Sequence, residues 1–209
     1  PEQGLVYDAK NLAFILPAGK YIGNSRYKDV FAASAVADLT SFRNHWGAET
    51  SLDVELYRPV ARYELVAKDV ATFLNKLSTG GLKVESFTAR VKYSDYLPTG
   101  YNLWDDVPKN SLMYMEYKVA FERPADGTKE LILGFDYVLT DAGETVSIPV
   151  ELEILNEKNE VLARTAFRIP CERGKNTTAR GNFLTSDANG GIGIDPDYDG
   201  DLEVDLGEL

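Results

Sequence analysis

Residues 131–155, LILGFDYVLTDAGETVSIPVELEIL, decide the fold. They hold two runs in which apolar residues recur at every second position, separated by the polar stretch DAGE at 141–144. A period of two is typical of a β-strand with one face on a core and the other toward water. A short turn containing glycine joins two such strands into an antiparallel hairpin. The inward sets are Leu131, Leu133, Phe135, Tyr137 and Leu139, then Val146, Ile148, Val150, Leu152 and Ile154, with Asp136, Glu151 and Glu153 expected toward water.

The same period continues on both sides of this hairpin. It runs through residues 113–121 before it and residues 161–169 after it, across the turn sequences PADGT at 124–128 and NEKN at 156–159. No helical pattern interrupts this series, so consecutive strands are expected to pair antiparallel. The predicted fold class is therefore all-β, an antiparallel β-sandwich.

Two earlier runs, at 53–67 and 82–93, are predicted to be further strands of the same sheets. The apolar phase of the first changes at Arg58-Pro59, which indicates a bulge or a crossing between sheets. Between the runs, apolar residues at helical spacing predict one short helix over about 69–78, with Asp69 as its N-cap and Gly80-Gly81 ending it. This helix is expected to cover one end of the sandwich.

The first quarter of the chain has a weaker pattern and is expected to be a separate unit. Residues 1–52 are interpreted as the remainder of an N-terminal β domain, and residues 53–209 as a C-terminal β-sandwich domain. The N-terminal part holds a strand candidate at 12–16, a turn at Gly23-Asn24 and a connecting loop at 40–51.

Composition excludes several classes of site. The chain has a formal net charge of -11, and the segment 187–209 holds eight acidic and no basic residues, so a phosphate-binding basic stripe is absent and nucleic acid is not an expected partner. One cysteine and one histidine cannot supply a four-ligand zinc site by His and Cys ligation. A histidine-based catalytic site would need the fold to bring Cys171 or a serine to His45, and a loop contact or hydrogen bond is the expected role of His45. No phosphate-binding glycine motif occurs, and no cofactor is expected.

The acidic stretch DPDYDGD at 195–201 looks like the start of an EF-hand loop. Asp195, Asp197 and Asp199 match the first ligand positions, but the twelfth position, which must supply a bidentate carboxylate, is Leu206. The EF-hand is therefore rejected. Two readings remain: a weaker calcium site at these three aspartates, completed by carbonyl oxygens, and an acidic connection between strands.

Aromatic residues gather in the predicted loop YSDYLPTGYNLWDD at 93–106. Tyr96, Tyr101 and Trp104 are candidates for stacking on a glycan, and the alternative is that they pack over an edge of the sandwich. Glycoside hydrolysis needs two carboxylates at a defined separation, and nothing among the 33 acidic residues singles out such a pair. We therefore expect no catalytic site.

Four segments share short motifs with a known family. They are YIGNSRYKDVFAA at 21–33, VELYRPVARYEL at 54–65, TGYNLWDD at 99–106 and IPCERGKNTTARGNFLT at 169–185, which is followed by DP at 195–196. In these segments the chain resembles the fimbrillin-type pilus proteins of Bacteroidales. The matching positions of the closing motif are Ile169-Pro170, Arg173, Asn176, Thr177, Gly181-Asn182, Leu184-Thr185 and Asp195-Pro196.

This resemblance implies a transthyretin-like β-sandwich that serves as a cell-surface fimbrial subunit or fimbria-associated adhesin at the outer membrane. The chain is expected to be a processed form of an exported lipoprotein, with membrane contact through a lipid anchor outside these 209 residues. Its expected partners are other fimbrial subunits and host or bacterial surface ligands. The alternative is a surface glycan-binding β-sandwich lipoprotein.

In the polymerising members of that family, a strand from one subunit fills a groove in the next, which is β-augmentation. The end of this chain, DLEVDLGEL at 201–209, carries Leu202, Val204 and Leu206 at alternate positions. This segment is interpreted either as the last strand of its own sheet or as a donor strand.

Overall fold

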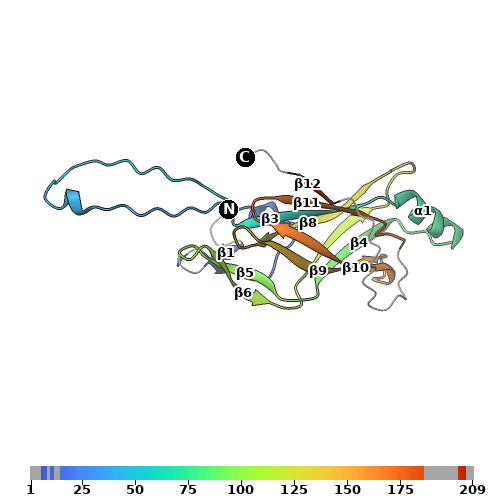
Figure 1. Cartoon of the computed structure of the whole chain (residues 1–209). Helices are drawn as coiled ribbons and strands as arrows, with labels where there is room; N and C mark the ends of the chain where they lie inside the picture. Colours follow the sequence, from blue (N-terminus) through green and yellow to red (C-terminus); the bar gives the residue numbers. More distant parts are fainter. Residues whose placement is uncertain (1–5, 9, 12–14, 186–201, 206–209) are drawn as a thin grey trace.

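Alternating apolar residues build two four-stranded sheets that enclose one core (Figure 1). The computed structural model describes residues 6–8, 10–11, 15–185 and 202–205. Its elements in chain order are β1 (Tyr7–Asp8), β2 (Leu16–Pro17), η1 (Arg26–Lys28), η2 (Thr40–Phe42), β3 (Val60–Ala67), α1 (Val70–Thr79), β4 (Ser86–Tyr93), β5 (Leu97–Asn102), β6 (Val107–Leu112), β7 (Glu116–Glu122), β8 (Leu131–Leu139), β9 (Thr145–Leu155), β10 (Val161–Glu172), β11 (Asn176–Gly181) and β12 (Leu202–Asp205). The predicted all-β sandwich with one helix is confirmed.

The first sheet has the strand order β10-β9-β4-β7 and is antiparallel throughout. Val91 of β4 lies opposite Leu152 of β9 and Tyr117 of β7, so the alternating apolar residues of neighbouring strands share one face. Each of these three side chains is buried. The period of two therefore predicted this sheet correctly, because the register is regular along β9, β4 and β7 and shifts only near the start of β10, between Val161 and Ala163.

The second sheet, β12-β11-β3-β8, contains a parallel pair that the sequence reasoning did not anticipate. β11 runs parallel to β3, with Thr177 opposite Tyr63, whereas β3 and β8 are antiparallel. The expectation of antiparallel pairing between consecutive strands is wrong at this point and also at β8. The predicted hairpin over residues 131–155 does not form, because β8 pairs with β3 in the second sheet, whereas β7 and β9, before and after it, belong to the first sheet. The short turn at 173–175 carries the chain from β10 in the first sheet to β11 in the second, so β11 pairs with β3 instead of folding back on β10.

A β-bulge in β8 reverses which residues face the core. The register with β3 shifts between Leu65 and Val66, which lie opposite Gly134 and Ile132. Beyond the bulge Asp136 is fully buried, so its expected position toward water is wrong, and Ile132 on the near side is 56% exposed. One extra residue in the bulge changes the alternation by one step.

Gly134 is required at this bulge by the close approach of the opposite sheet. Its φ is +153°, and a Cβ there would lie 3.2 Å from carbons of both Tyr117 and Val119. These neighbours belong to β7 of the first sheet, so the bulge brings the two sheets together at the missing side chain.

Helix α1 covers the end of the sandwich, as predicted, and lies at the far end from residues 33–56 (Figure 1). The apolar residues at helical spacing, Val70, Phe73, Leu74 and Leu77, are buried. Asp69 occupies the N-cap position, but its side chain makes no hydrogen bond to the helix. Its Oδ2 accepts hydrogen bonds instead from the backbone N–H groups of Leu184 and Thr185 and from the Thr185 hydroxyl, at 2.8–3.0 Å. The predicted cap therefore anchors the segment that follows β11.

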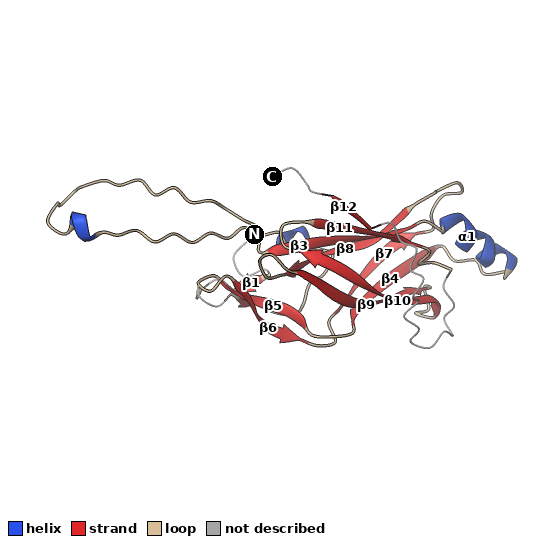
Figure 2. Cartoon of the chain, viewed as in Figure 1, coloured by secondary structure: helices blue, strands red, loops and turns tan. Residues whose placement is uncertain are grey.

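Residues 33–56 project from the sandwich as a long loop, which we call the arm (Figure 1, Figure 2). Ala32 and Tyr57 close its base by exchanging two backbone hydrogen bonds of 2.8 and 2.9 Å. The strand predicted over 53–67 forms only from Val60 onward, because residues 53–56 belong to the arm. The phase change at Arg58-Pro59 thus marks the point where the chain leaves the arm and enters β3.

Two further differences between the structure and the sequence prediction lie in the segments next to the arm. The predicted loop at 93–106 contains β5 and continues into the β5–β6 hairpin, in which Asn102 pairs with Val107. Residues before the arm pack against this hairpin, since Ile15 and Tyr101 exchange two backbone hydrogen bonds of 2.8 Å.

The domain boundary at residue 52 stays a prediction. Within the described residues, no helix combines the length and the apolar character needed to cross a membrane.

Candidate functional site

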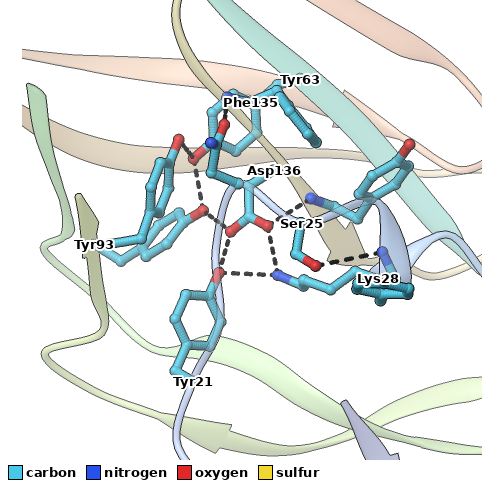
Figure 3. A network of polar contacts seen from close by, with 11 residues as sticks. Tyr21, Ser25, Lys28, Tyr63, Tyr93, Phe135 and Asp136 are labelled. Atoms are coloured by element: carbon cyan, nitrogen blue, oxygen red, sulfur yellow. Dashed lines mark hydrogen bonds and ion pairs between the residues drawn. The ribbon is translucent and has the colours of Figure 1, made fainter. Parts of the chain in front are cut away.

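The buried carboxylate of Asp136 is the centre of a polar cluster between the sheets (Figure 3). Its Oδ2 accepts hydrogen bonds from the hydroxyls of Tyr21 and Tyr93, the latter at 2.7 Å. Its Oδ1 accepts from Lys28 Nζ at 2.7 Å and from the backbone N–H of Tyr137 at 2.8 Å. Tyr93 lies on β4, Asp136 on β8 and Lys28 in η1, so the carboxylate joins both sheets to the segment before the arm.

A chain of tyrosines extends this Asp136 cluster. The Tyr63 hydroxyl lies 2.6 Å from that of Tyr93 and 3.2 Å from that of Tyr117. Burial, reinforced by the negative charge of the carboxylate, raises the pKa of Tyr21, Tyr63 and Tyr93 well above the usual range. Burial lowers the pKa of Lys28, while the carboxylate opposes that change. The tyrosines therefore stay protonated and act as hydrogen-bond donors that hold the fold.

The Asp136 cluster has little room for a ligand. A cavity of about 30 Å³, lined in part by Tyr7, Tyr21 and Lys28, lies beside it. That volume suits one or two water molecules, whereas small-molecule sites usually occupy roughly 300–1,000 Å³. The arrangement is suited to joining segments of the chain.

A second polar cluster is centred on Asp106, just before β6. Arg173 donates two hydrogen bonds to its carboxylate, at 2.8 and 2.7 Å, and the hydroxyls of Tyr57 and Tyr101 donate at 2.5 and 2.7 Å. The Arg173 guanidinium also lies 4.1 Å from the centre of the Tyr57 ring. The hydrogen bonds from Arg173, with smaller contributions from both tyrosines, lower the pKa of Asp106 to about 2 against the opposing effect of burial.

The four segments that resemble fimbrillins meet around these two clusters. Arg173 Nε donates to the backbone carbonyl of Arg58 at 3.3 Å, and Arg58 Nε donates to Asp29 at 3.0 Å. The Asn24 N–H donates to the carbonyl of Phe135, and the Phe135 N–H donates back to Asn24 Oδ1, which covers part of the β8 edge. These motif residues therefore form an internal framework.

A third cluster lies on the outer face of the first sheet around Glu153. Hydrogen bonds to its carboxylate come from Arg90 Nε at 2.6 Å and Arg164 Nε at 3.0 Å, and Lys92 Nζ lies 2.9 Å away. Burial raises the pKa of Glu153, but the hydrogen bonds from Lys92, Arg90 and Arg164 outweigh it and lower the pKa to about 2. Glu153 is on the outer face, as expected, but its cationic neighbours cover it completely.

Arg168 lies two outward positions along β10 from Arg164. Its guanidinium donates to the side-chain and backbone oxygens of Ser147, at 3.0 and 2.9 Å. No carboxylate among the described residues forms an ion pair with it. The outer face of β10 therefore carries a positive charge that the described chain does not neutralise.

The three aromatic candidates do not form one binding platform. Tyr101 is 2% exposed and donates to Asp106, whereas Tyr96 and Trp104 are 63% and 79% exposed. Tyr96 precedes β5 and Trp104 follows it, so the six-residue strand, about 20 Å long at about 3.3 Å per residue, lies between them. Tyr114, 83% exposed, is an exposed ring that the sequence reasoning missed.

The other candidates give little further chemistry. Asp195, Asp197, Asp199 and Leu206 lie outside the described residues. Leu202 and Val204 belong to β12, whose backbone pairs antiparallel with β11 at the edge of the second sheet. Across the described residues no group of three or more His, Cys, Asp or Glu could hold a metal ion. Cys171 is buried, and burial raises its pKa to about 12, which suits a core residue.

An open groove of about 190 Å³ lies between the arm base and the β10–β11 turn, lined in part by Arg58, Arg62 and Lys175. Each of these cations already has an acidic partner: Asp29, Glu64 and Glu172 lie 3.0, 2.7 and 2.5 Å away, respectively. The groove is also smaller than typical ligand pockets. It offers no unneutralised charge for a substrate.

The arm differs from all these regions because its apolar side chains are exposed. Its return limb carries Leu52, Val54 and Leu56, which are 54%, 46% and 63% exposed, and Trp46 near its tip is 98% exposed. Among the described residues, no backbone hydrogen bond joins the outgoing limb, 33–38, to the return limb, 49–56. Unpaired extended backbone of this kind is a template for pairing with another chain.

Comparison with known proteins gives a family. The profile of a family of unknown function, DUF6562, matches residues 1–207, and the chain belongs to this family. No curated protein matches the sequence.

Two solved structures are similar, each described as a "putative cell adhesion protein". The one from Bacteroides ovatus shares 13% identity at a TM-score of 0.36, covering 61% of this chain and 41% of that one. The one from Bacteroides eggerthii shares 11% identity at a TM-score of 0.32, covering 63% of this chain and 49% of that one. The matched regions span less than half the length of both proteins.

Proposed function

We propose that this member of the DUF6562 family is a non-catalytic subunit of a cell-surface fibre, a fimbrial subunit or fimbria-associated adhesin, that assembles by β-strand donation. The observation that carries the proposal is the arm, which presents unpaired backbone and alternating apolar side chains to solvent. An extended segment of this kind fits the edge of another sheet, where backbone hydrogen bonds give affinity and alternate side chains fill pockets.

Exposure of the apolar side chains of the arm to water costs free energy. Complete burial of a Leu or Val side chain favours association by roughly 1.5–3 kcal/mol. Leu52, Val54 and Leu56 therefore supply a driving force that the isolated chain does not use, because all three are about half exposed or more.

The polar clusters favour a structural role over catalysis. The carboxylates of Asp106 and Glu153 each have at least three donors or cations around them, and the pKa of both is lowered. A general acid needs the opposite change, a pKa raised toward neutrality. Asp136 is enclosed beside a cavity too small for a substrate.

The location at the cell surface, export as a processed lipoprotein and a fimbrillin-type fold are parts of the same proposal. They rest on the four motif segments, which form the internal framework around Asp106 and Asp136. The donor role of Leu202, Val204 and Leu206 stays a prediction; the described backbone of β12 pairs within its own sheet.

Deletion of the arm tests the proposal. Residues 33–56 are replaced by Asn-Gly, a two-residue turn suited to the paired Ala32 and Tyr57. Surface fibres of cells that make the unaltered protein should carry antibody label, and cells that make the deletion variant should lack labelled fibres while exporting the protein. If the fibres on cells that make the unaltered protein carried no antibody label, the fimbrial assignment would be overturned.

The second candidate function is glycan binding, favoured by the exposure of Trp104, at 79%, on the turn between β5 and β6. Under this reading, Trp104→Ala should abolish retention on a polysaccharide column and leave assembly unchanged. The ring of Tyr101 is buried and is therefore not part of the proposed glycan contact. Equal retention of both proteins would remove the candidate.

A further inference from the structure

We propose that the return limb of the arm adds as a strand to the β10 edge of a second copy of this chain, with its acidic face against Arg164 and Arg168. This inference rests on the proposed function and deepens it by naming the partner and the acceptor edge. It is separate from donation by residues 202–206.

The return limb has the pattern of a half-buried strand. Leu52, Val54 and Leu56 occupy one face, and Asp53 and Glu55 occupy the other. All five are exposed, and neither acidic residue forms an ion pair with another described residue. A suitable acceptor edge therefore continues an apolar face on one side and carries cations on the other.

The charged residues of the edge strands show which edge could accept an acidic strand. β7 carries Glu116, Lys118 and Glu122 on its outward face, so its edge would repel an acidic limb. The sequence of β12, LEVD, contains no basic residue that could pair with such a limb. At β8, Asn24 already bonds to the Phe135 backbone.

β10 has the required charge. Its outward face carries Arg168, which pairs with no described carboxylate, and Arg164, which shares the single carboxylate of Glu153 with Arg90 and Lys92. Both arginines are exposed, and residues 161–171 include no acid. Its inward face carries Ala163, Phe167 and Ile169, all buried, which an added strand bearing Leu52, Val54 and Leu56 would extend.

β10 also has the required position. It is the outermost strand of its sheet and pairs with β9 on one side. Pro170 has no N–H, and its carbonyl already accepts from the Thr177 hydroxyl, so the added strand should pair along the part before Ile169. In this part of β10, Arg164 and Arg168 lie on either side of the outward residue Ala166. Asp53 and Glu55 are two positions apart, so in an added strand each would lie directly opposite or diagonal to one of the two arginines.

Charge reversal tests the pairing in solution. The arm variant is Asp53→Lys with Glu55→Lys, and the edge variant is Ala166→Glu with Arg168→Glu, which leaves the Arg164–Glu153 contact in place. Each variant alone should weaken self-association, measured by sedimentation of the full chain, by about tenfold or more. A chain with all four changes should regain association. Lys118→Glu on β7 is the matched control and should change nothing. Circular dichroism and thermal unfolding confirm that each variant is folded.

Three results would overturn this pairing: a monomeric parent chain at all concentrations, arm or edge variants that associate normally, or a four-change chain that does not recover. If arm deletion abolishes fibres while the reversals have no effect, the fibre function stands and the β10 acceptor is wrong. If arm deletion also leaves assembly intact, the arm has no part in it.

Discussion

The sandwich body and the arm differ in how their polar and apolar groups are accommodated. In the body, the buried carboxylate of Asp136 has four donors around it and lies among protonated tyrosines. In the arm, the apolar residues Leu52, Val54 and Leu56 are exposed, and the limbs share no described backbone hydrogen bond. The Asp136 cluster therefore finds its hydrogen-bond partners within the chain, whereas the apolar side chains of the arm would need another surface to become buried. Stability should therefore depend on the body and association on the arm.

The largest expected effect is the loss of the Asp136 carboxylate. Asp136→Ala leaves Lys28 and two tyrosine hydroxyls without their buried acceptor, which should lower the free energy of unfolding by about 3–5 kcal/mol. Urea denaturation measures this loss. A loss below about 1 kcal/mol, the range of an exposed ion pair, would show that the cluster is not a structural lock.

Acid should weaken the body next. The pKa of Glu153 is about 2 in the folded chain against an ordinary 4.5, so its stabilisation is complete above about pH 4.5 and is lost as the pH falls toward 2. For this fully covered side chain the loss is about 2–3 kcal/mol. Asp106 titrates in the same range, but its side chain is 40% exposed and solvent screening reduces its share. Glu153→Gln should flatten the stability profile between pH 4.5 and 2, and an unchanged slope would contradict the assignment.

A smaller loss is expected at the β8 bulge. Gly134→Ala introduces a Cβ about 3.2 Å from the Tyr117 and Val119 side chains and should destabilise the fold by about 1–3 kcal/mol. Gly19→Ala is the matched control, because no atom lies within 4 Å of its added Cβ. Equal melting temperatures for both variants would mean that the sheets can separate at this point without cost.

Local periodicity predicts the strands, but it predicts neither the β8 bulge nor the sheet that each strand joins. Periodicity identified the strands of the first sheet and helix α1, because their apolar spacing is local and uninterrupted. It placed Asp136 toward water because a bulge is set by the cross-strand register with β3, which local spacing does not encode. The parallel pairing of β11 was missed for the same reason, since it depends on where the turn at 173–175 delivers the chain.

The arm was hidden by its own alternation. Leu52, Val54 and Leu56 have the spacing of a strand, so periodicity predicts residues 53–59 as part of one, although no described strand pairs with them. In the polar clusters, Arg173 and Tyr101 lie in recognisable motifs, but Asp106 and Asp136 have no local feature that distinguishes them among 33 acids. Their roles depend on contacts between distant segments.

The smallest effect on stability is expected in the arm. Changing Leu52, Val54 and Leu56 together to serine should shift the free energy of unfolding by no more than about 0.5 kcal/mol, because the side chains are already exposed. The same triple variant should lose self-association. A loss of stability as large as that of Gly134→Ala would place these residues in the fold of their own chain.

The most direct test of the division between body and arm is sedimentation of the full chain beside the variant with residues 33–56 replaced by Asn-Gly. We predict that the full chain forms dimers or larger species as its concentration rises. The variant should remain a monomer with an unchanged melting temperature. Identical association of the two proteins, or a variant that no longer folds, would contradict the account.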